Sequence, residues 1–237
     1  MSMTILLQGA GGRLGSAIRE LAEADPELRC LPLPRAGRPE PGAEVLIDVS
    51  VPEGLARSIE VAEALGVALV VGTTGLDGDA LARLRALSRK VPVLHARNFS
   101  PGMAAMRRVA AELARLLDWD VEIAEVHHRA KRDAPSGTAL ALLETVAAAR
   151  GQAPRWEDRA APANGLPRAH GSIGVAVLRG GSVPGEHSVH WFGEDERIEL
   201  RHVAEHRRLF ARGALLAARR LAGRPPGWYE FDRLLWD

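Results

Sequence analysis

The chain opens with a run of glycines between a short apolar strand and an amphipathic helix. TILLQ (4–8) has β character, GAGGRLG (9–15) follows at once, and Leu14, Ile18 and Leu21 then recur at helical spacing. Glycine at every third position of the turn gives a G-x-x-G-x-x-G variant of the dinucleotide-binding fingerprint. Such glycines allow a tight turn, a close approach of a pyrophosphate and close helix–strand packing, and the helix start would hold the phosphates. This start predicts a nucleotide-binding α/β domain.

The first half of the chain continues this alternation of apolar strands and helices. Strands are predicted at 28–33, 44–50, 67–75 and 91–96, and helices at 16–24, 52–66 and 77–90. The alternation indicates a Rossmann-like, doubly wound parallel sheet, in which ligands bind beyond the carboxyl ends of the strands. GAGGRL, GTTG (72–75) and ARNFSPG (96–102) are the turns at those ends. PRAGRPEPGA, between the second and third strands, is too short for a crossover helix, so one helix is predicted to be missing.

After residue 100 the pattern changes. Helices are predicted at 101–117, 136–150 and 207–222, a strand at 120–128, a long loop at 151–170, and an aromatic tail at the end. Period-two alternation within 172–204 predicts three antiparallel strands of an open-faced sheet that needs a cover. We therefore predict a dinucleotide-binding domain of residues 1–98, completed by 207–237. Residues 99–206 would form an α+β domain with an open mixed or antiparallel sheet, for substrate binding and oligomerisation.

Composition excludes several classes of protein. The net charge of the 237 residues is +1, with 30 acidic residues against 31 basic ones, which gives no general attraction to nucleic acid or anionic membranes. No apolar run approaches the ~18 residues of a membrane span, and no charged-then-apolar leader opens the chain. Cys30 is the one cysteine, which suits a reducing compartment. These features predict a cytoplasmic enzyme without nucleic-acid or membrane partners.

Residues 125–140, EVHHRAKRDAPSGTAL, concentrate positive charge at the end of a predicted strand and the start of a predicted helix. His127 and His128 can titrate near neutral pH. The following S-G-T offers backbone N–H groups and two hydroxyls to an anion. Lys131 is one of only two lysines, and lysine can donate a proton where arginine stays charged. The segment predicts a pocket for a small, multiply anionic substrate beside a redox cofactor.

Several stretches together resemble one enzyme family. QGAGGRLG, GTTG, ARNFSPG, EVHHRAKRDAPSGTAL, RGGSVPGEHSV and FARGALLAARRLAG are similar to 4-hydroxy-tetrahydrodipicolinate reductase (dihydrodipicolinate reductase) of bacterial lysine and diaminopimelate biosynthesis. The resemblance runs nearly end to end. It implies an NAD(P)H-dependent oxidoreductase, typically a homotetramer, that reduces a small cyclic dicarboxylate to tetrahydrodipicolinate. NADPH or NADH would be the cofactor, and no metal is expected.

The resemblance also implies roles for individual residues. His127 matches the general acid/base, Lys131 the proton donor, His128 a substrate contact, and Gly137 with Thr138 the seat of a substrate carboxylate. Gly9, Ala10, Gly11, Gly12, Arg13, Leu14, Gly72, Thr73, Thr74, Ala96, Arg97, Asn98 and Phe99 match the cofactor contacts. Physical chemistry agrees, because hydride addition leaves negative charge that a nearby acid must quench.

The sequence departs from the family after the second strand, where relatives usually carry an acidic residue. Residues 28–39 contain no Asp or Glu. In dinucleotide-binding folds this position reads the ribose, with a carboxylate favouring NAD and an arginine pairing with the 2′-phosphate of NADP. Arg35 is therefore added to the predicted cofactor contacts. We expect NADP(H) to bind at least as well as NAD(H).

Three alternatives remain open from the sequence. The first is another two-domain NAD(P)-dependent dehydrogenase, acting on an amino acid. The second is a metal-dependent hydrolase built on His127, His128 and Asp133, although adjacent histidines on a strand point to opposite faces and suit a shared metal poorly. The third is an arginine-rich nucleic-acid binder, which the balance of charge disfavours.

Overall fold

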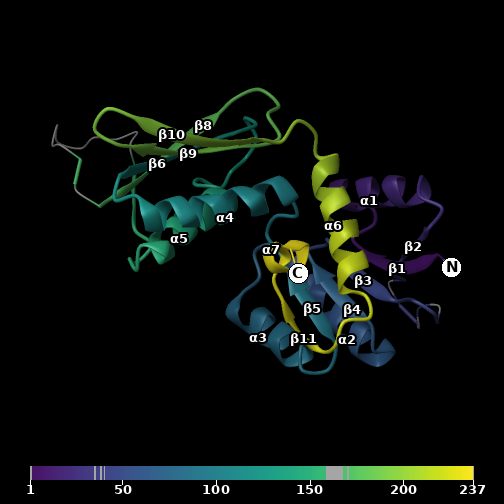
Figure 1. The fold of residues 1–237 in the computed structure, drawn as a ribbon. Helices are drawn as coiled ribbons and strands as arrows, with labels where there is room; N and C mark the ends of the chain where they lie inside the picture. The colour runs from purple at the N-terminus through teal and green to yellow at the C-terminus, as the bar shows by residue number, and fades with distance from the viewer. Residues whose placement is uncertain are drawn as a thin grey trace. The chain divides into compact units, whose positions relative to one another are not determined.

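A computed structural model describes residues 2–34, 36–37, 39, 41–158, 168–169 and 171–236. The chain divides into two compact units. Unit 1 contains Met1–Pro101 together with Arg207–Asp237, and unit 2 contains Gly102–His206. Each unit has one sheet with helices packed against it (Figure 1). No helix within the described ranges is both long and apolar enough to cross a membrane.

Unit 1 contains a six-stranded sheet in which every neighbouring pair of strands is parallel. Its strands are β1 (Met3–Gln8), β2 (Leu28–Pro32), β3 (Val45–Asp48), β4 (Ala68–Val71), β5 (Pro92–His95) and β11 (Gly227–Tyr229). They lie in the order β11-β5-β4-β3-β1-β2. The predicted parallel sheet is confirmed. The last strand, β11, lies in the aromatic tail, for which the sequence analysis predicted no strand.

The strand order places the helices of unit 1 on both faces of the sheet. The helices are α1 (Arg13–Glu23), η1 (Pro52–Gly54), α2 (Leu55–Leu65), α3 (Gly78–Leu87), α6 (Arg208–Leu221) and α7 (Phe231–Trp236). The chain moves one way from β1 to β2 and the other way from β3 to β5, so right-handed crossovers put α1 opposite α2 and α3. Helix α6 packs beside α1 and α7 packs on α6 (Figure 1).

The change of direction between β1 and β3 creates the crevice in which such folds bind ligands. Both strands are buried, β3 along its whole length, and their carboxyl ends lead into the glycine turn at 9–12 and into Val49 and Ser50. The described residues between β2 and β3 hold no helix, as the short Pro- and Gly-rich segment predicts. Unit 1 is thus a doubly wound domain whose open end lies at the glycine turn.

Unit 2 contains a five-stranded mixed sheet. Its elements are α4 (Pro101–Leu116, which starts in unit 1), β6 (Asp120–His127), α5 (Gly137–Ala149), β7 (Trp156–Asp158), β8 (Ile173–Arg179), β9 (Glu186–Phe192) and β10 (Arg197–Val203). The strand order is β10-β9-β6-β8-β7. Strands β9 and β10 pair antiparallel as predicted, but β8 runs parallel to both β6 and β7. The three alternating strands thus run in alternating directions as predicted, but β8 pairs with β6 and β7 and not with β9, so the sheet is a mixed one. Strand β7 lies within the segment predicted as a loop.

Helices α4 and α5 cover one face of this sheet. Alternate residues of the central strands, such as Ile123 of β6 and Trp191 of β9, are fully buried against both helices. The opposite face carries partly exposed apolar side chains, with Leu178 50%, Phe192 39% and Val203 44% exposed. One face is therefore the core of unit 2, and the other is the open face that the alternation predicted.

Candidate active site

The glycine turn after β1 needs its glycines for steric reasons. Gly9 has φ +85°, and a Cβ there would lie 2.6 Å from the carbonyl oxygen of Val49. A Cβ at Gly15 would lie 2.1 Å from the carbonyl oxygen of Gly9. The turn is closed by the N–H of Gly12, which donates to that same oxygen at 2.9 Å. The first and last glycines are thus fixed by close backbone packing, as the fingerprint predicts.

The start of α1 is open to an anion. Gly12 is its N-cap, and no side chain of the described residues accepts from the first N–H groups of the helix. Gly11, Gly12 and Arg13 are exposed, whereas Ala10 and Leu14 are partly buried. An uncapped helix start with its positive dipole end is a ready site for a phosphate. The predicted cofactor contacts of the first turn therefore lie together.

A buried carboxylate joins the next two loops of unit 1. Asp48, fully buried at the end of β3, accepts through Oδ1 from the N–H and the hydroxyl of Ser50 and from the hydroxyl of Thr73, at 2.9, 2.6 and 2.8 Å. Thr73 is therefore held inward, while Thr74 is exposed. Asp48 is a residue that sequence reasoning missed, although it is the lone acidic residue in an otherwise apolar strand.

The remaining predicted cofactor residues of unit 1 differ in exposure. Phe99 is buried and packs edge-on to Phe231, with ring centroids 5.5 Å apart. A Cβ added at Gly72 would lie 2.6 Å from the ring of Phe99 and would clash with it. Ala96 is also buried, Asn98 accepts through Oδ1 from the N–H of Ser100, and Arg97 is exposed. The ring of Phe99 therefore packs directly against the backbone of Gly72. Arg35 lies outside the described residues.

In unit 2, the segment from His127 to Thr138 links the end of β6 to the start of α5. Ser136 is the N-cap of α5, and its hydroxyl accepts from the N–H of Ala139 at 3.2 Å. Gly137 and Thr138 form the first turn and are partly exposed. The sequence predicted this helix start as a seat for a carboxylate, and the local geometry of an N-cap is present.

The predicted titrating residues of this segment have distinct environments. His127 is buried at 8% exposure, whereas His128 is partly exposed. The Nζ atom of Lys131 lies 2.8 Å from each carboxylate oxygen of Asp133. Burial opposes ionisation of Asp133, but the hydrogen bonds and charge of Lys131 outweigh it and lower the pKa of that carboxyl. Lys131 is thus held in an ion pair with Asp133.

Three residues that sequence reasoning missed surround His127. Glu125 is fully buried, and its Oε2 lies 2.8 Å from Nδ1 of His127 and 3.8 Å from Nε2 of His187. The guanidinium of Arg179 on β8 donates to Oε1 of Glu125 at 3.0 Å. Glu125 could have been found from the sequence, because it stands two residues before His127 and a strand places such residues on one face. Arg179 and His187 depend on strand pairing.

The cluster has unequal proton affinities. Burial would raise the pKa of Glu125, but hydrogen bonds from His127, Ser136 and Arg179 outweigh it and lower that pKa to about 2. Burial, followed by the positive charge of His127, lowers the pKa of His187 to about 4. At neutral pH the cluster therefore holds an ionised Glu125 beside a neutral His187.

Among the described residues, Glu125, His127 and His187 place possible metal ligands within 4.8 Å of one another. His128 and Asp133 do not belong to this group. The guanidinium of Arg179 already neutralises Glu125 and would repel a divalent cation in a buried site. The arrangement therefore suits proton transfer better than metal binding.

Comparison with known proteins identifies the family. The profile described as "Dihydrodipicolinate reductase, N-terminus" matches residues 37–99, and "Dihydrodipicolinate reductase, C-terminus" matches residues 102–235. The 4-hydroxy-tetrahydrodipicolinate reductase of Anaeromyxobacter dehalogenans (strain 2CP-1) is 40% identical, with 98% of this chain and 97% of that protein covered. The enzyme of that name from Gluconobacter oxydans is 44% identical over 94% of this chain and 93% of its own length.

Solved structures share the fold. Dipicolinate-bound dihydrodipicolinate reductase from Paenisporosarcina sp. TG-14 has a TM-score of 0.76 at 20% identity, covering 97% of this chain and 98% of its own. Aspartate dehydrogenase from Thermotoga maritima has a TM-score of 0.51 at 13% identity, covering 95% and 99%. The fold is thus shared with a dehydrogenase of another kind, whereas both relatives named above are 4-hydroxy-tetrahydrodipicolinate reductases. This chain belongs to the dihydrodipicolinate reductase family.

Proposed function

We propose that this chain catalyses the NAD(P)H-dependent reduction of 4-hydroxy-tetrahydrodipicolinate to tetrahydrodipicolinate in lysine and diaminopimelate biosynthesis. Family membership supports this reaction. The observation that carries the proposal is the segment 127–138, in which a buried histidine and a partly buried lysine precede an N-capped helix start. That segment offers both a proton source and an anion seat.

The substrate residues act in unit 2. Gly137 and Thr138 hold one carboxylate of the substrate at the start of α5, and His128 contacts the substrate. Loss of water from the hydroxylated substrate gives a conjugated imine, which must then gain a hydride and a proton. Lys131 donates the proton, and His127 acts as general acid/base beside it. The positive charge of Lys131 also stabilises the negative charge that hydride addition creates.

The residues of unit 1 fit a dinucleotide. The exposed, uncapped start of α1 suits a pyrophosphate, and the glycines leave room for its approach. Residues 9–14 would bind the phosphates, while residues 72–74 and 96–99 line the adjoining ends of β4 and β5. When bound, the nicotinamide cofactor supplies the hydride, and this chain supplies its position. Asp48 keeps two of these loops in place by binding Ser50 and Thr73.

The two units divide this work. Residues 1–98, completed by 207–237, bind the dinucleotide, and residues 99–206 bind the substrate and form the oligomer. The open face of unit 2, with exposed Leu178, Phe192 and Val203, supports a homotetramer, because such apolar area is usually buried in a protein contact. The enzyme acts in the cytoplasm, consistent with a soluble biosynthetic family and a single free cysteine.

NADPH should bind at least as tightly as NADH. The 28–39 segment contains no carboxylate that would repel a 2′-phosphate, and Arg35 follows the glycine loop at about the distance in sequence at which such folds read the ribose. A charge-assisted hydrogen bond to phosphate contributes about 1.5–3 kcal/mol, roughly ten- to a hundredfold in affinity. Fluorescence titration of both cofactors against wild type and Arg35→Ala measures this. A preference for NADH, or unchanged NADPH affinity in the variant, would remove Arg35 from the site.

The reaction itself is tested by following cofactor absorbance with the purified chain. NADPH should be consumed when enzymatically generated 4-hydroxy-tetrahydrodipicolinate is present, and should be stable without it. The competing assignment predicts instead that oxaloacetate, or another 2-oxo acid, with ammonia supports NAD(P)H oxidation. Consumption with the 2-oxo acid and ammonia, but not with 4-hydroxy-tetrahydrodipicolinate, would replace the proposed reaction by that of an amino-acid dehydrogenase.

A further inference from the structure

Glu125 is a buried charge for which the reaction described above gives no role. Its side chain is fully buried on β6, and an ionised carboxylate in such a place is costly unless it is paired and hydrogen-bonded. Arg179 alone would satisfy the charge, since its guanidinium donates to Oε1 at 3.0 Å. The other contacts of Glu125 reach two functional features of unit 2, and they indicate more than a structural ion pair.

The Oε1 atom of Glu125 holds the entrance to α5. It accepts from the N–H of Ser136, the N-cap residue of α5, at 2.9 Å. Arg179 tightens the same stretch, because its Nη2 donates to the carbonyl oxygen of Asp133 at 2.7 Å as well as to Glu125. One carboxylate oxygen therefore fixes the position at which Gly137 and Thr138 begin the helix.

The Oε2 atom of Glu125 faces the proposed acid/base. It lies 2.8 Å from Nδ1 of His127, while the opposite ring nitrogen, Nε2, faces Gly185, where a Cβ would lie 3.0 Å away. The negative charge of the carboxylate attracts a hydrogen and repels a lone pair, so at this distance it favours the imidazole form that carries its hydrogen on Nδ1. Nε2 is then the nitrogen that can exchange a proton with a substrate. Any larger residue at position 185 would crowd that nitrogen.

We propose that Glu125 is a positioning residue that aligns two parts of the site through its two oxygens. Oε2 fixes the ring orientation and the tautomer of His127, and Oε1 fixes the anion-binding start of α5. The role of the residue in catalysis rests on the proposed function, because His127 and the seat have their roles from it. The tautomer of His127 is a property of the chain itself and can be measured without turnover.

The first measurement is nitrogen-15 spectroscopy of the histidine rings of the full-length wild-type protein in alkaline buffer. An ordinary imidazole has a pKa of about 6.5 and is neutral there. The signal that His127→Gln removes assigns the ring among the eight histidines. Hydrogen on Nδ1, with Nε2 either bare or protonated, supports the proposal. A ring with hydrogen on Nε2 alone overturns it, whatever the activity of the enzyme.

The second measurement compares Glu125→Gln with Glu122→Gln. Glu122 lies on the same strand, is partly exposed and pairs with Arg168 at 3.1 Å, so it is a matched control away from His127. Because an amide can donate as well as accept, Glu125→Gln should raise the population with hydrogen on Nε2. It should lower kcat by about 10- to 100-fold, the scale of residues that orient a functional ligand. The control should keep the wild-type spectrum and rate.

If Glu125→Gln does not fold, the double variant Glu125→Gln/Arg179→Gln is measured in its place. It removes both charges of the pair and therefore leaves no unpaired guanidinium. The same shift of the His127 tautomer and the same loss of kcat are expected there, at an unfolding midpoint near that of wild type. A folded variant of either kind with wild-type tautomer and kcat overturns the proposal. Absence of turnover in wild type, with hydrogen on Nδ1 of His127, would instead refute the proposed function and leave the positioning intact.

Discussion

At the scale of single residues, the candidate site of unit 2 contains two ion pairs. Lys131 is paired with Asp133, and Glu125 is paired with Arg179 and contacts His127. The first pair is at the surface and can exchange partners, because the carboxylate of Asp133 is 61% exposed. The Glu125 carboxylate of the second pair is fully buried, so this pair cannot exchange partners with a ligand in solution. We therefore expect an anionic ligand to be able to replace Asp133 beside Lys131 while Glu125 keeps its contacts.

Removing the lysine should remove most of the proton transfer. Lys131→Ala is expected to lower kcat by about 100-fold or more, the usual scale of an acid/base contribution, with little change in NADPH affinity. Lys131→Arg should also be poor, because a guanidinium donates protons badly at neutral pH. Arg132→Ala, at the exposed next position, is the matched control and should keep near-normal turnover. Near-normal kcat in Lys131→Ala would contradict the role.

His187 should make the fold sensitive to mild acid. Burial, aided by the charge of His127, lowers its pKa to about 4 from 6.5. Between these values the unfolded chain binds a proton that the folded chain excludes, so stability falls as the pH drops from 6.5 to 4. The slope is at most about 1.4 kcal/mol per pH unit from this residue. Urea unfolding at several pH values should show a shallower slope in His187→Gln than in wild type.

His190→Gln is the control for that experiment, because it lies on the same strand and is partly exposed on the opposite face. Its slope should stay near that of wild type. Equal slopes in wild type and His187→Gln would show that His187 takes up its proton as readily in the folded chain as in the unfolded one.

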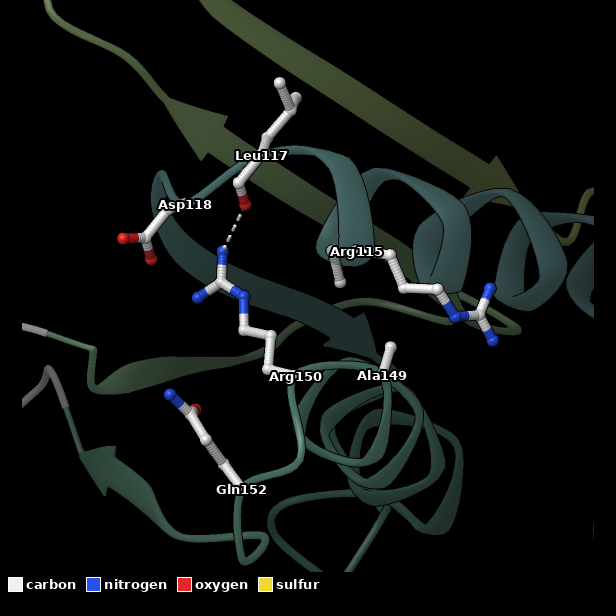
Figure 2. A pocket seen from close by; sticks show the side chains of 7 residues that line it. Arg115, Leu117, Asp118, Ala149, Arg150 and Gln152 are labelled. Atoms are coloured by element: carbon white, nitrogen blue, oxygen red, sulfur yellow. Dashed lines mark hydrogen bonds between the residues drawn. The ribbon is translucent and has the colours of Figure 1, made fainter.

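At the scale of elements, Arg150 joins the two helices of unit 2. It is the C-cap residue of α5, and its Nη2 donates to the carbonyl oxygens of Leu117 and Trp119, at 3.1 and 2.6 Å, just beyond the end of α4. Figure 2 shows the side chain reaching from α5 toward Leu117 in a pocket that also contains Arg115. The free carbonyls after a helix need such donors. Arg150 thus holds the turn between α4 and β6.

The Arg150→Met variant keeps the length of the side chain and removes its donors. It should lower the free energy of unfolding by about 1–2 kcal/mol, because two partly buried carbonyl groups lose their donor. Arg115→Met, in the same pocket, loses a surface pair with Glu112 at 2.9 Å and should change stability by less than about 0.5 kcal/mol. Equal denaturation midpoints for the two variants would contradict this account of Arg150.

The elements also show what a sequence can and cannot reveal. The parallel sheet of unit 1 was predictable because β1, β3, β4 and β5 are short apolar runs, each followed by a helix. The pairing of β8 with β6 was not, because period-two alternation tells which face a residue occupies and says nothing about which strand lies beside it. The three-residue strands β7 and β11 are too short to show a period.

The candidate site also contains some residues that the sequence reveals and others that it does not. His127, Lys131 and the start of α5 are close in sequence, so their motif was visible. Glu125 shares that motif but was overlooked, although its spacing from His127 on a strand was sufficient to place it. Arg179 and His187 join the cluster only through the pairing of β6 with β8 and β9, which is a long-range contact.

At the scale of the whole molecule, the open face of unit 2 predicts the state of association. Leu178 and Phe192 are exposed apolar residues on that face. The wild type should have about four times the 25.5 kDa mass of one chain in light scattering. Leu178→Glu with Phe192→Glu should lower that mass, because charges are costly in a buried contact. Leu116→Glu, at 75% exposure on α4, should not. An unchanged mass in the double variant would show that this face is not the contact.

The central claim is that this chain moves a hydride from a nicotinamide cofactor to the dihydrodipicolinate skeleton. The most direct measurement uses NADPH that carries deuterium at the transferable position, with enzymatically generated 4-hydroxy-tetrahydrodipicolinate and mass analysis of the product. The account predicts tetrahydrodipicolinate with a single deuterium, formed at the rate at which NADPH disappears. Product without deuterium, or cofactor oxidation without tetrahydrodipicolinate, would contradict it.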